Sequence, residues 1–248
     1  MSKQLLIYSN VTALNRRDHS ELAYKPTDRF DFTREINAAP VMLGEIAVAS
    51  TEFAIVFADA GEVPMPAALF GVNVNANLFV GPDGKWLANY LPAFLRRWPF
   101  VFSTDESGQT LTLCIDETAP GFNREGRGER LFDSDGVPTS FTNGMLGFLQ
   151  EYQAQQVRTQ DFAARLVALD LLQSVEARIA LPGAEPRTLT GFKVVNREKL
   201  KALPAETLEQ LFRSDELELI YLHLFSLRNM DRLREKALQA LSDVPAGA

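Results

Sequence analysis

The chain has 248 residues, of which 46% are hydrophobic and 23% are charged, and its formal net charge at pH 7 is −7. This composition is typical of a globular protein, and the acidic balance argues against non-specific binding to DNA or RNA, which requires a basic surface. The single cysteine, Cys114, excludes an internal disulfide bond.

The first forty residues predict little regular structure. Residues 3–7 have the apolar content of a short opening strand, and the segment that follows, up to Pro40, is polar and irregular. Its His19 stands among charged residues, as expected of a loop histidine exposed to solvent. The sequence shows no apolar leader with a small-residue cleavage site and no run of about eighteen apolar residues. We therefore expect a cytoplasmic protein without a membrane span.

From Val41 onward the pattern becomes that of a sheet with short helical inserts. Residues 42–49 predict a short helix. Strand-length apolar runs follow at 53–58, 67–72, 77–80 and 85–88. The last two are joined by Pro82-Asp-Gly84, in which proline and glycine favour a tight turn, so they predict a hairpin.

A short helix and a strand pair are expected next. Pro92 is tolerated in the first turn of a helix and Pro99 ends it, so the helix runs through Arg97. Residues 100–102 and 111–115 predict two paired strands, and 117–138 form a loop rich in glycine and arginine.

The second half of the chain changes to helical spacing. Residues 139–157 and 159–172 predict two helices, with Thr159 capping the second. Alternating residues at 175–181 and 188–195 predict a β-hairpin. Short helices follow Asn196 and Pro204, and Asp215 with Glu218 resembles a capping box that opens a long helix towards Leu241.

These elements predict an α+β fold. Residues 1–138 form a mainly antiparallel sheet with short helical inserts, and residues 139–248 form helices plus a β-hairpin. We expect the two parts to pack as one compact unit. The oligomeric state is left open, a homo-oligomer included.

The densest group of candidate site residues lies between Trp86 and Trp98. Arg96 and Arg97 follow Tyr90 closely, and each could stack on an aromatic ring or grip a carboxylate. The structural alternative is an ion pair that orients the short helix, with Asp116 as the partner, and tryptophans that belong to the core.

His223 is the histidine expected inside the protein. Ser226 and Asn229 fall on the same side of its helix, so the group is either an acid–base site or a core histidine that bridges helix and sheet. The candidate ligand-binding residues are Arg96, Arg97, Trp98, Tyr90, Trp86, His223 and Asp116.

No motif predicts a metal site or a cofactor. The two histidines are far apart in the sequence, and one cysteine cannot complete a zinc site of the usual spacing. There is no phosphate-binding loop and no nucleophile elbow. We expect neither a metal ion nor a cofactor.

Several blocks, in order, resemble the SapC-like family of bacterial proteins. They are Phe79-Val-Gly-Pro-Asp-Gly-Lys-Trp86, Tyr90-Leu-Pro92, Arg96-Arg-Trp-Pro-Phe100, Leu131-Phe-Asp133 and Tyr221-Leu-His-Leu-Phe-Ser226. The resemblance implies an association with surface-layer (S-layer) loci, TonB-dependent receptors, halogenase-like enzymes and cupin-like proteins. It implies no catalytic residues.

Two functions of different classes follow. The first is a non-catalytic accessory or adaptor protein that binds a peptide or protein partner, linked to S-layer or TonB-dependent receptor systems, through an aromatic groove bearing arginine. The alternative is an enzyme that modifies a peptide or protein together with halogenase-like and cupin-like neighbours. That enzyme would use Arg96, Arg97, Asp116 and His223 around one cleft.

Overall fold

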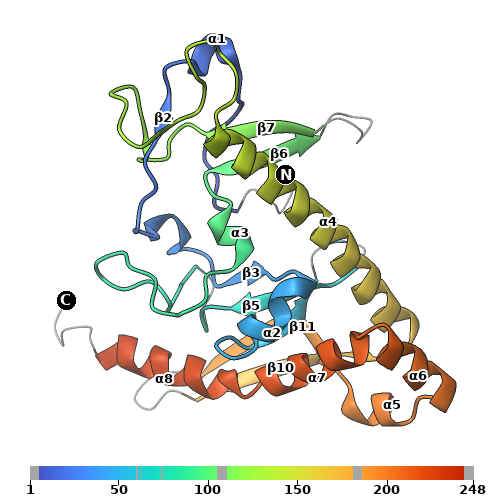
Figure 1. Cartoon of the computed structure of the whole chain (residues 1–248). Helices are drawn as coiled ribbons and strands as arrows, with labels where there is room; N and C mark the ends of the chain where they lie inside the picture. Colours follow the sequence, from blue (N-terminus) through green and yellow to red (C-terminus); the bar gives the residue numbers. More distant parts are fainter. Residues whose placement is uncertain are drawn as a thin grey trace.

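The computed structural model describes residues 6–59, 61, 63–73, 75–104, 111–180 and 186–242. It is an α+β structure with antiparallel sheets, which confirms the predicted fold class. A long helix crosses the molecule diagonally and joins the upper strands to a lower layer of helices (Figure 1). No helix within the described ranges is long and apolar enough to cross a membrane.

Short strands alternate with short helices in the first half of the chain, and longer elements follow. The strands are β1 (Val11–Ala13), β2 (Ala23–Tyr24), β3 (Ala38–Pro40), β4 (Ile55–Ala58), β5 (Met65–Leu69), β6 (Phe100–Thr104), β7 (Leu111–Asp116), β8 (Phe122–Asn123), β9 (Glu129–Arg130), β10 (Leu172–Ile179) and β11 (Arg187–Val195). The helices are α1 (Arg16–His19), η2 (Asp31–Thr33), η3 (Leu43–Glu45), α2 (Ile46–Ala49), α3 (Ala93–Arg96), α4 (Ser140–Ala168), α5 (Arg197–Lys201), α6 (Ala205–Arg213), α7 (Glu216–Ser226) and α8 (Asn229–Ser242), of which η2 and η3 are 3-10 helices.

The largest sheet draws its strands from both halves of the chain. Its order is β10-β11-β4-β5-β3, and β11 pairs with β4 by placing Lys193 opposite Phe57. The predicted hairpin therefore completes a sheet that begins in the N-terminal half. The two other sheets have the orders β1-β7-β6 and β8-β2-β9.

The N-terminal segment is more regular than its composition predicts. Residues 3–5 of the expected opening strand lie outside the described residues, and Leu6 and Ile7 form a turn. The segment up to Pro40 contains β1, β2 and β3, which pair with β7, with β8 and β9, and with β5. Strands of two or three residues are too short to show alternation in a sequence, and partners far along the chain create them.

The predicted hairpin at 77–88 is reduced to one bridge between Val80 and Trp86. The Leu87 N–H donates to the carbonyl of Phe79 across this bridge, as the predicted hairpin requires, whereas the Leu78 N–H donates to the carbonyl of Phe70, outside the hairpin. The hairpin therefore forms next to its turn, and the N–H groups of Asn77 and Leu78 bond residues outside it, which keeps the ladder short.

The two helices predicted on either side of Thr159 are one helix, α4. The Thr159 hydroxyl donates to the Gln155 carbonyl at 2.6 Å and accepts from the Leu43 N–H at 3.1 Å. Threonine inside a helix bonds the carbonyl four residues earlier as readily as it caps a new helix, so the sequence alone does not separate the two roles.

The long C-terminal helix predicted from Asp215 is divided into α7 and α8. Asp215 has a left-handed backbone (φ 60°) and its side chain makes no cap hydrogen bond. At the break, the Asn229 side-chain amide donates to the carbonyls of Ser50 at 2.8 Å and Phe53 at 3.0 Å. The helical spacing continues across the break, which is why the sequence predicts one helix.

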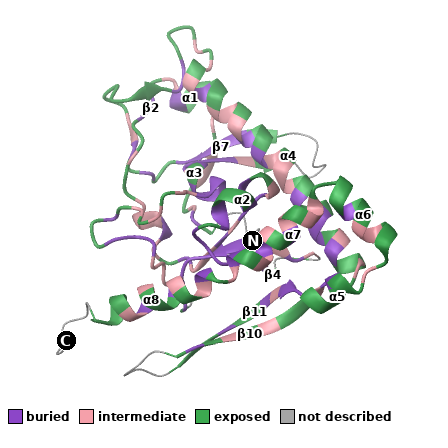
Figure 2. Ribbon diagram, turned by 60° about the horizontal axis from the view of Figure 1, so that its bottom comes forward, coloured by how far each residue is buried: buried purple, intermediate pink, exposed green. Residues whose placement is uncertain are grey.

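Three groups of buried side chains hold these layers together. The largest surrounds the five-stranded sheet and includes Phe53, Phe70 and Phe79. A second lies between β4, α4, α6 and α7, and a third lies between β6, β7 and the first half of α4. β4 lies in the buried interior, whereas α5 and α6 present mostly exposed residues (Figure 2).

Candidate binding cleft

Two buried carboxylates position the candidate residues that follow Trp86. Glu45, at the end of η3, accepts from the Tyr90 hydroxyl at 2.5 Å and from the Ala93 N–H at 2.6 Å. Its other oxygen accepts from the Met42 N–H at 3.0 Å. Burial, and next the hydrogen bond to Glu45, raise the pKa of Tyr90 far above its ordinary value. Tyr90 is therefore a neutral donor that ties its loop to η3.

Glu52 fixes the same loop from a second side. Its carboxylate accepts from the N–H groups of Asn89 and Tyr90 at 2.9 to 3.0 Å, and it lies 3.9 Å from the Arg232 guanidinium. Sequence reasoning missed both glutamates. The sequence did carry a signal for them, because both are acidic residues within the apolar stretch 42–58. A carboxylate buried in such a stretch needs hydrogen-bond donors around it.

Arg96 and Arg97 are neighbours in the sequence but have different surroundings. The Arg97 side chain is 3% exposed, and its guanidinium lies 4.5 Å from the ring centroid of Phe94 and 4.8 Å from that of Tyr152. Burial raises the pKa of Tyr152 to about 12, although the charge of Arg97 opposes this. Arg97 is an interior cation held by aromatic faces.

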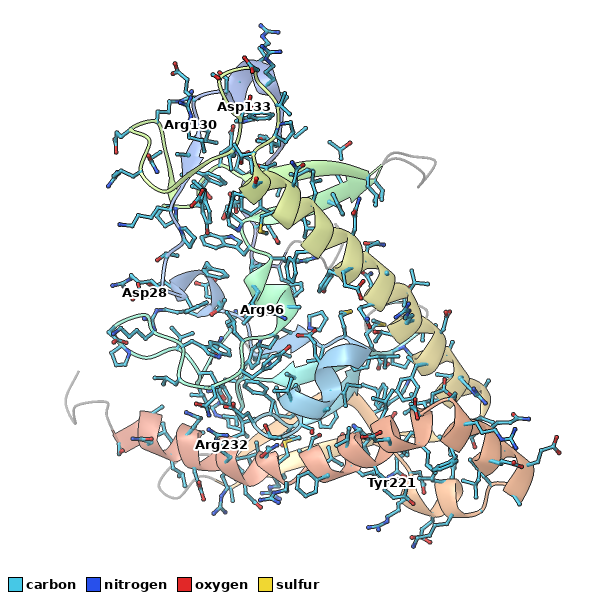
Figure 3. The ribbon with its side chains drawn as sticks, in the orientation of Figure 1. Asp28, Arg96, Arg130, Asp133, Tyr221 and Arg232 are labelled. Atoms are coloured by element: carbon cyan, nitrogen blue, oxygen red, sulfur yellow. The ribbon has the colours of Figure 1, made fainter. Side chains whose placement is uncertain are left out.

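The Arg96 side chain, by contrast, is 45% exposed. Its guanidinium lies 5.5 Å from the ring centroid of Phe148 and 5.9 Å from that of Tyr90, and 4.0 Å from the Glu45 carboxylate. It lies on α3, between the upper strands and the large sheet (Figure 3). Of the two arginines, Arg96 can reach a ligand.

Trp98 forms the centre of a cleft. Its ring stacks on Phe32 with centroids 3.9 Å apart and planes 12° apart. Its indole Nε1–H is buried and finds no acceptor among the described residues. A buried indole N–H normally has a partner, so this donor has unused hydrogen-bonding capacity.

Two cavities meet at the Phe32–Trp98 stack, and we call them together the aromatic cleft. Both are lined by Thr27, Phe32 and Trp98. The smaller, of about 220 Å³, is otherwise mainly apolar; it is lined also by Tyr24, Phe30, Phe100, Phe141, Met145 and Arg96, among others. The larger, of about 410 Å³, has more polar residue types in its lining; it is lined also by Ile7, Ser9, Arg29, Asp31, Asp116 and Thr118, among others.

Asp116 contributes an ionised carboxylate to the wall of the larger cavity. Its oxygens accept from the Thr118 hydroxyl at 2.6 Å and from the N–H groups of Ser9 and Asn10 at 2.7 and 3.1 Å. Burial raises the pKa of Asp116, but the hydrogen bonds together outweigh it and leave the pKa below its ordinary value. The structure thus gives Asp116 a set of backbone donors at the end of β7.

His223 lies in another part of the protein. Its Nε2 accepts from the Val195 N–H of β11 at 3.0 Å, and its ring stands edge-on to Phe57 at 5.0 Å. Burial lowers its pKa to about 4, so the ring is neutral at pH 7 and carries its proton on Nδ1. Nearby, Ser226 accepts from the Ile55 N–H at 3.0 Å. This geometry joins α7 to the sheet.

The seven candidate residues therefore separate into groups. Arg96, Trp98 and Asp116 line the aromatic cleft, whereas Arg97 and His223 line neither of its cavities. Trp86 donates to the Tyr90 carbonyl at 2.8 Å and packs against the phenylalanines of the largest core group. Both residues therefore belong to the packing next to the cleft and do not line it.

The cleft presents groups that can contact a ligand. Its walls supply aromatic faces, one exposed arginine and a carboxylate that is already hydrogen-bonded. Among the described residues, no three His, Cys, Asp or Glu side chains are grouped so that they could hold a metal ion.

A second apolar surface lies on α7, on the side away from His223. Tyr221 and Phe225 are 45% and 52% exposed and, with Leu222, Leu224, Arg197 and Glu218, line a hollow of about 560 Å³. Figure 3 shows Tyr221 on the lower helix layer, far from Arg96. This hollow is larger than either cavity of the cleft taken alone.

Comparison with known proteins gives one match. Residues 14–233 match the family described as SapC, which is most of the chain. No curated protein matches the chain, and no solved structure matches it. The matched range includes every lining residue of the cleft named above except Ile7 and Ser9.

Proposed function

The chain belongs to the SapC family, and we propose that it is a non-catalytic protein that binds a peptide segment of another protein in the aromatic cleft. The observation that carries this proposal is the pair of cavities that meet at the Phe32–Trp98 stack. A chain that crosses the stack places one side chain in each cavity.

The lining of each cavity selects a different kind of side chain. The smaller cavity of about 220 Å³ is surrounded by aromatic rings and suits one aromatic or large aliphatic side chain. The larger cavity contains hydroxyl and charged groups and suits a polar neighbour.

Arg96 adds a charged contact at the same place. Tryptophan, tyrosine and arginine are the residue types that most often carry the binding energy of an interface. The candidate sources of the bound segment are proteins of S-layer or TonB-dependent receptor systems, with which the family resemblance associates the chain.

The proposal is tested with a library of displayed random peptides. Selected peptides are measured by the fluorescence of Trp98 in a Trp86→Phe background, where it is the sole tryptophan. We expect the selected sequences to share an aromatic or large aliphatic residue. Met145→Glu and Thr27→Phe, which place a charge or a ring in the smaller cavity, should weaken binding by at least about tenfold.

Val157→Glu is the matched control, because it adds the same charge on the same helix at a residue that is 50% exposed and outside the cleft. Its affinity should equal that of the parent protein. If no peptide family is enriched, or if binding is equal in Met145→Glu and Val157→Glu, the cleft does not bind peptides and the proposal fails.

A further inference from the structure

We propose that the outer edge of β10 pairs antiparallel with the same strand of a second copy of this chain, so that two five-stranded sheets join across a two-fold axis. This surface is separate from the aromatic cleft and does not depend on the proposed function. Figure 2 shows β10 and β11 as a long hairpin at one margin of the molecule.

β10 is an unusually open edge strand. The sheet order places it last, next to β11 alone, and it has eight residues without a proline. The opposite edge, β3, has three residues and ends at Pro40. A strand at the edge of a sheet presents backbone N–H and C=O groups that can pair with another chain, and proteins commonly limit this with short strands or proline. β3 carries both of these protections, and β10 carries neither.

The side chains of β10 alternate between the core and solvent. Val175 and Ala177 are partly buried against the largest core group and Ile179 is buried within it. Glu176 and Arg178 lie between them and are exposed. Neither forms an ion pair with a described residue. The exposed face of the strand therefore carries one negative and one positive charge, both available to a partner.

These two charges complement each other when the strand meets its own copy. Antiparallel pairing centred on Ala177 places Glu176 of each copy opposite Arg178 of the other, and Val175 opposite Ile179. Opposite charges directly across an antiparallel pair are stabilising, whereas like charges are destabilising. A two-fold interface repeats each contact, so both Glu–Arg pairs form together.

The irregularity of the hairpin lies on the other strand. Between the pairs Val175↔Phe192 and Ala177↔Leu189, β11 contains one residue more than β10. Gly191, with φ 80°, accommodates this bulge. β10 itself carries no extra residue there, and its residues alternate between partly buried or buried and exposed from Val175 to Ile179, on both sides of the proposed axis at Ala177.

The test uses the intact chain and measures its mass by sedimentation velocity over a range of concentrations at low salt. We expect the wild type to dimerise. Glu176→Arg and Arg178→Glu each place like charges opposite each other twice, so each variant should raise the dissociation constant by about tenfold or more. An equimolar mixture of the two variants restores both opposite-charge pairs and should dimerise like the wild type, as should the double variant.

Two controls separate this pairing from general effects of charge. Asp161→Arg and Arg158→Glu make the same changes of net charge at exposed positions of α4, and they should leave dimerisation unchanged. At a protein concentration low enough for the wild type to be monomeric, the circular dichroism spectra and thermal midpoints of all variants should match those of the wild type, because Glu176 and Arg178 are exposed. A wild type that stays monomeric overturns the proposal. So does a dimer that ignores both single changes, or one that the mixture fails to restore.

Discussion

The neutral histidine between α7 and the sheet makes the stability of the protein depend on pH. His223 accepts a hydrogen bond from Val195 while neutral, and burial lowers its pKa to about 4. In the unfolded chain the pKa of histidine is about 6.5. Between these values the unfolded state binds more protons than the folded state, so the free energy of unfolding falls as the pH falls.

The size of this loss follows from the two pKa values. Each unit of pKa difference corresponds to about 1.4 kcal/mol. Lowering the pH from about 7.5 to about 5 should therefore remove about 2 kcal/mol of the stability that neutral His223 contributes, and at still lower pH the loss approaches about 3 kcal/mol. The contribution is complete above the unfolded pKa and is lost as the pH falls towards the folded one.

The effect can be isolated with His223→Gln. Glutamine offers an oxygen at a similar reach for the Val195 N–H but does not titrate. Urea unfolding of both proteins between about pH 7.5 and about pH 5 gives two profiles, and the other titrating groups cancel in their difference. We expect the wild type to lose about 2 kcal/mol more than the variant. His19→Gln is the control, and profiles that stay parallel in His223→Gln would refute the reasoning.

Three further changes follow from the contacts of the loop and of α4, and urea unfolding measures each. Glu52→Ala leaves two backbone N–H groups without their acceptor and should lower the free energy of unfolding by about 2–5 kcal/mol. Glu52→Gln should recover part of this loss, and equal losses in the two variants would show that the carboxylate does not hold the loop. Tyr90→Phe removes the hydroxyl donor to Glu45 and should cost about 1.5–3 kcal/mol, and an unchanged midpoint would contradict this bond. Gly147→Ala adds a methyl group to α4 where no atom lies within 4 Å, so it should stabilise the protein by about 1 kcal/mol, whereas destabilisation would mean that the helix is not regular there.

Local patterns predicted the elements whose signals are local. The α3 helix between Pro92 and Pro99, the strand pair β6–β7, the hairpin β10–β11 and the Asn196 cap all depend on residues near one another in the sequence. The errors arise where one residue type has two uses. Thr159 was expected to begin a helix but continues one, and Asp215 was expected to cap a helix with its side chain but turns the chain with a left-handed backbone.

The candidate site was predictable in part. The pairing of arginines with aromatic rings could be read from the sequence, but the sequence pattern did not distinguish Arg96, which is exposed, from Arg97, which is buried. Glu45 and Glu52 could not be assigned their partners, since the N–H groups that they bind lie about forty residues later. The cleft itself depends on Phe32 reaching Trp98, a contact that no local pattern contains.

The order of strands in the large sheet also constrains how the protein is made. β4 is a central strand, yet its partner β11 leaves the ribosome only after about half of the chain has followed it. Until then the edge of β4 is unpaired, and the surface that Phe57 presents to α4, α6 and α7 is uncovered. Chains that stop before Arg187 therefore carry an exposed apolar strand, the kind of segment that associates wrongly during synthesis. The exposure of β4 ends when the completed β10–β11 hairpin pairs with it.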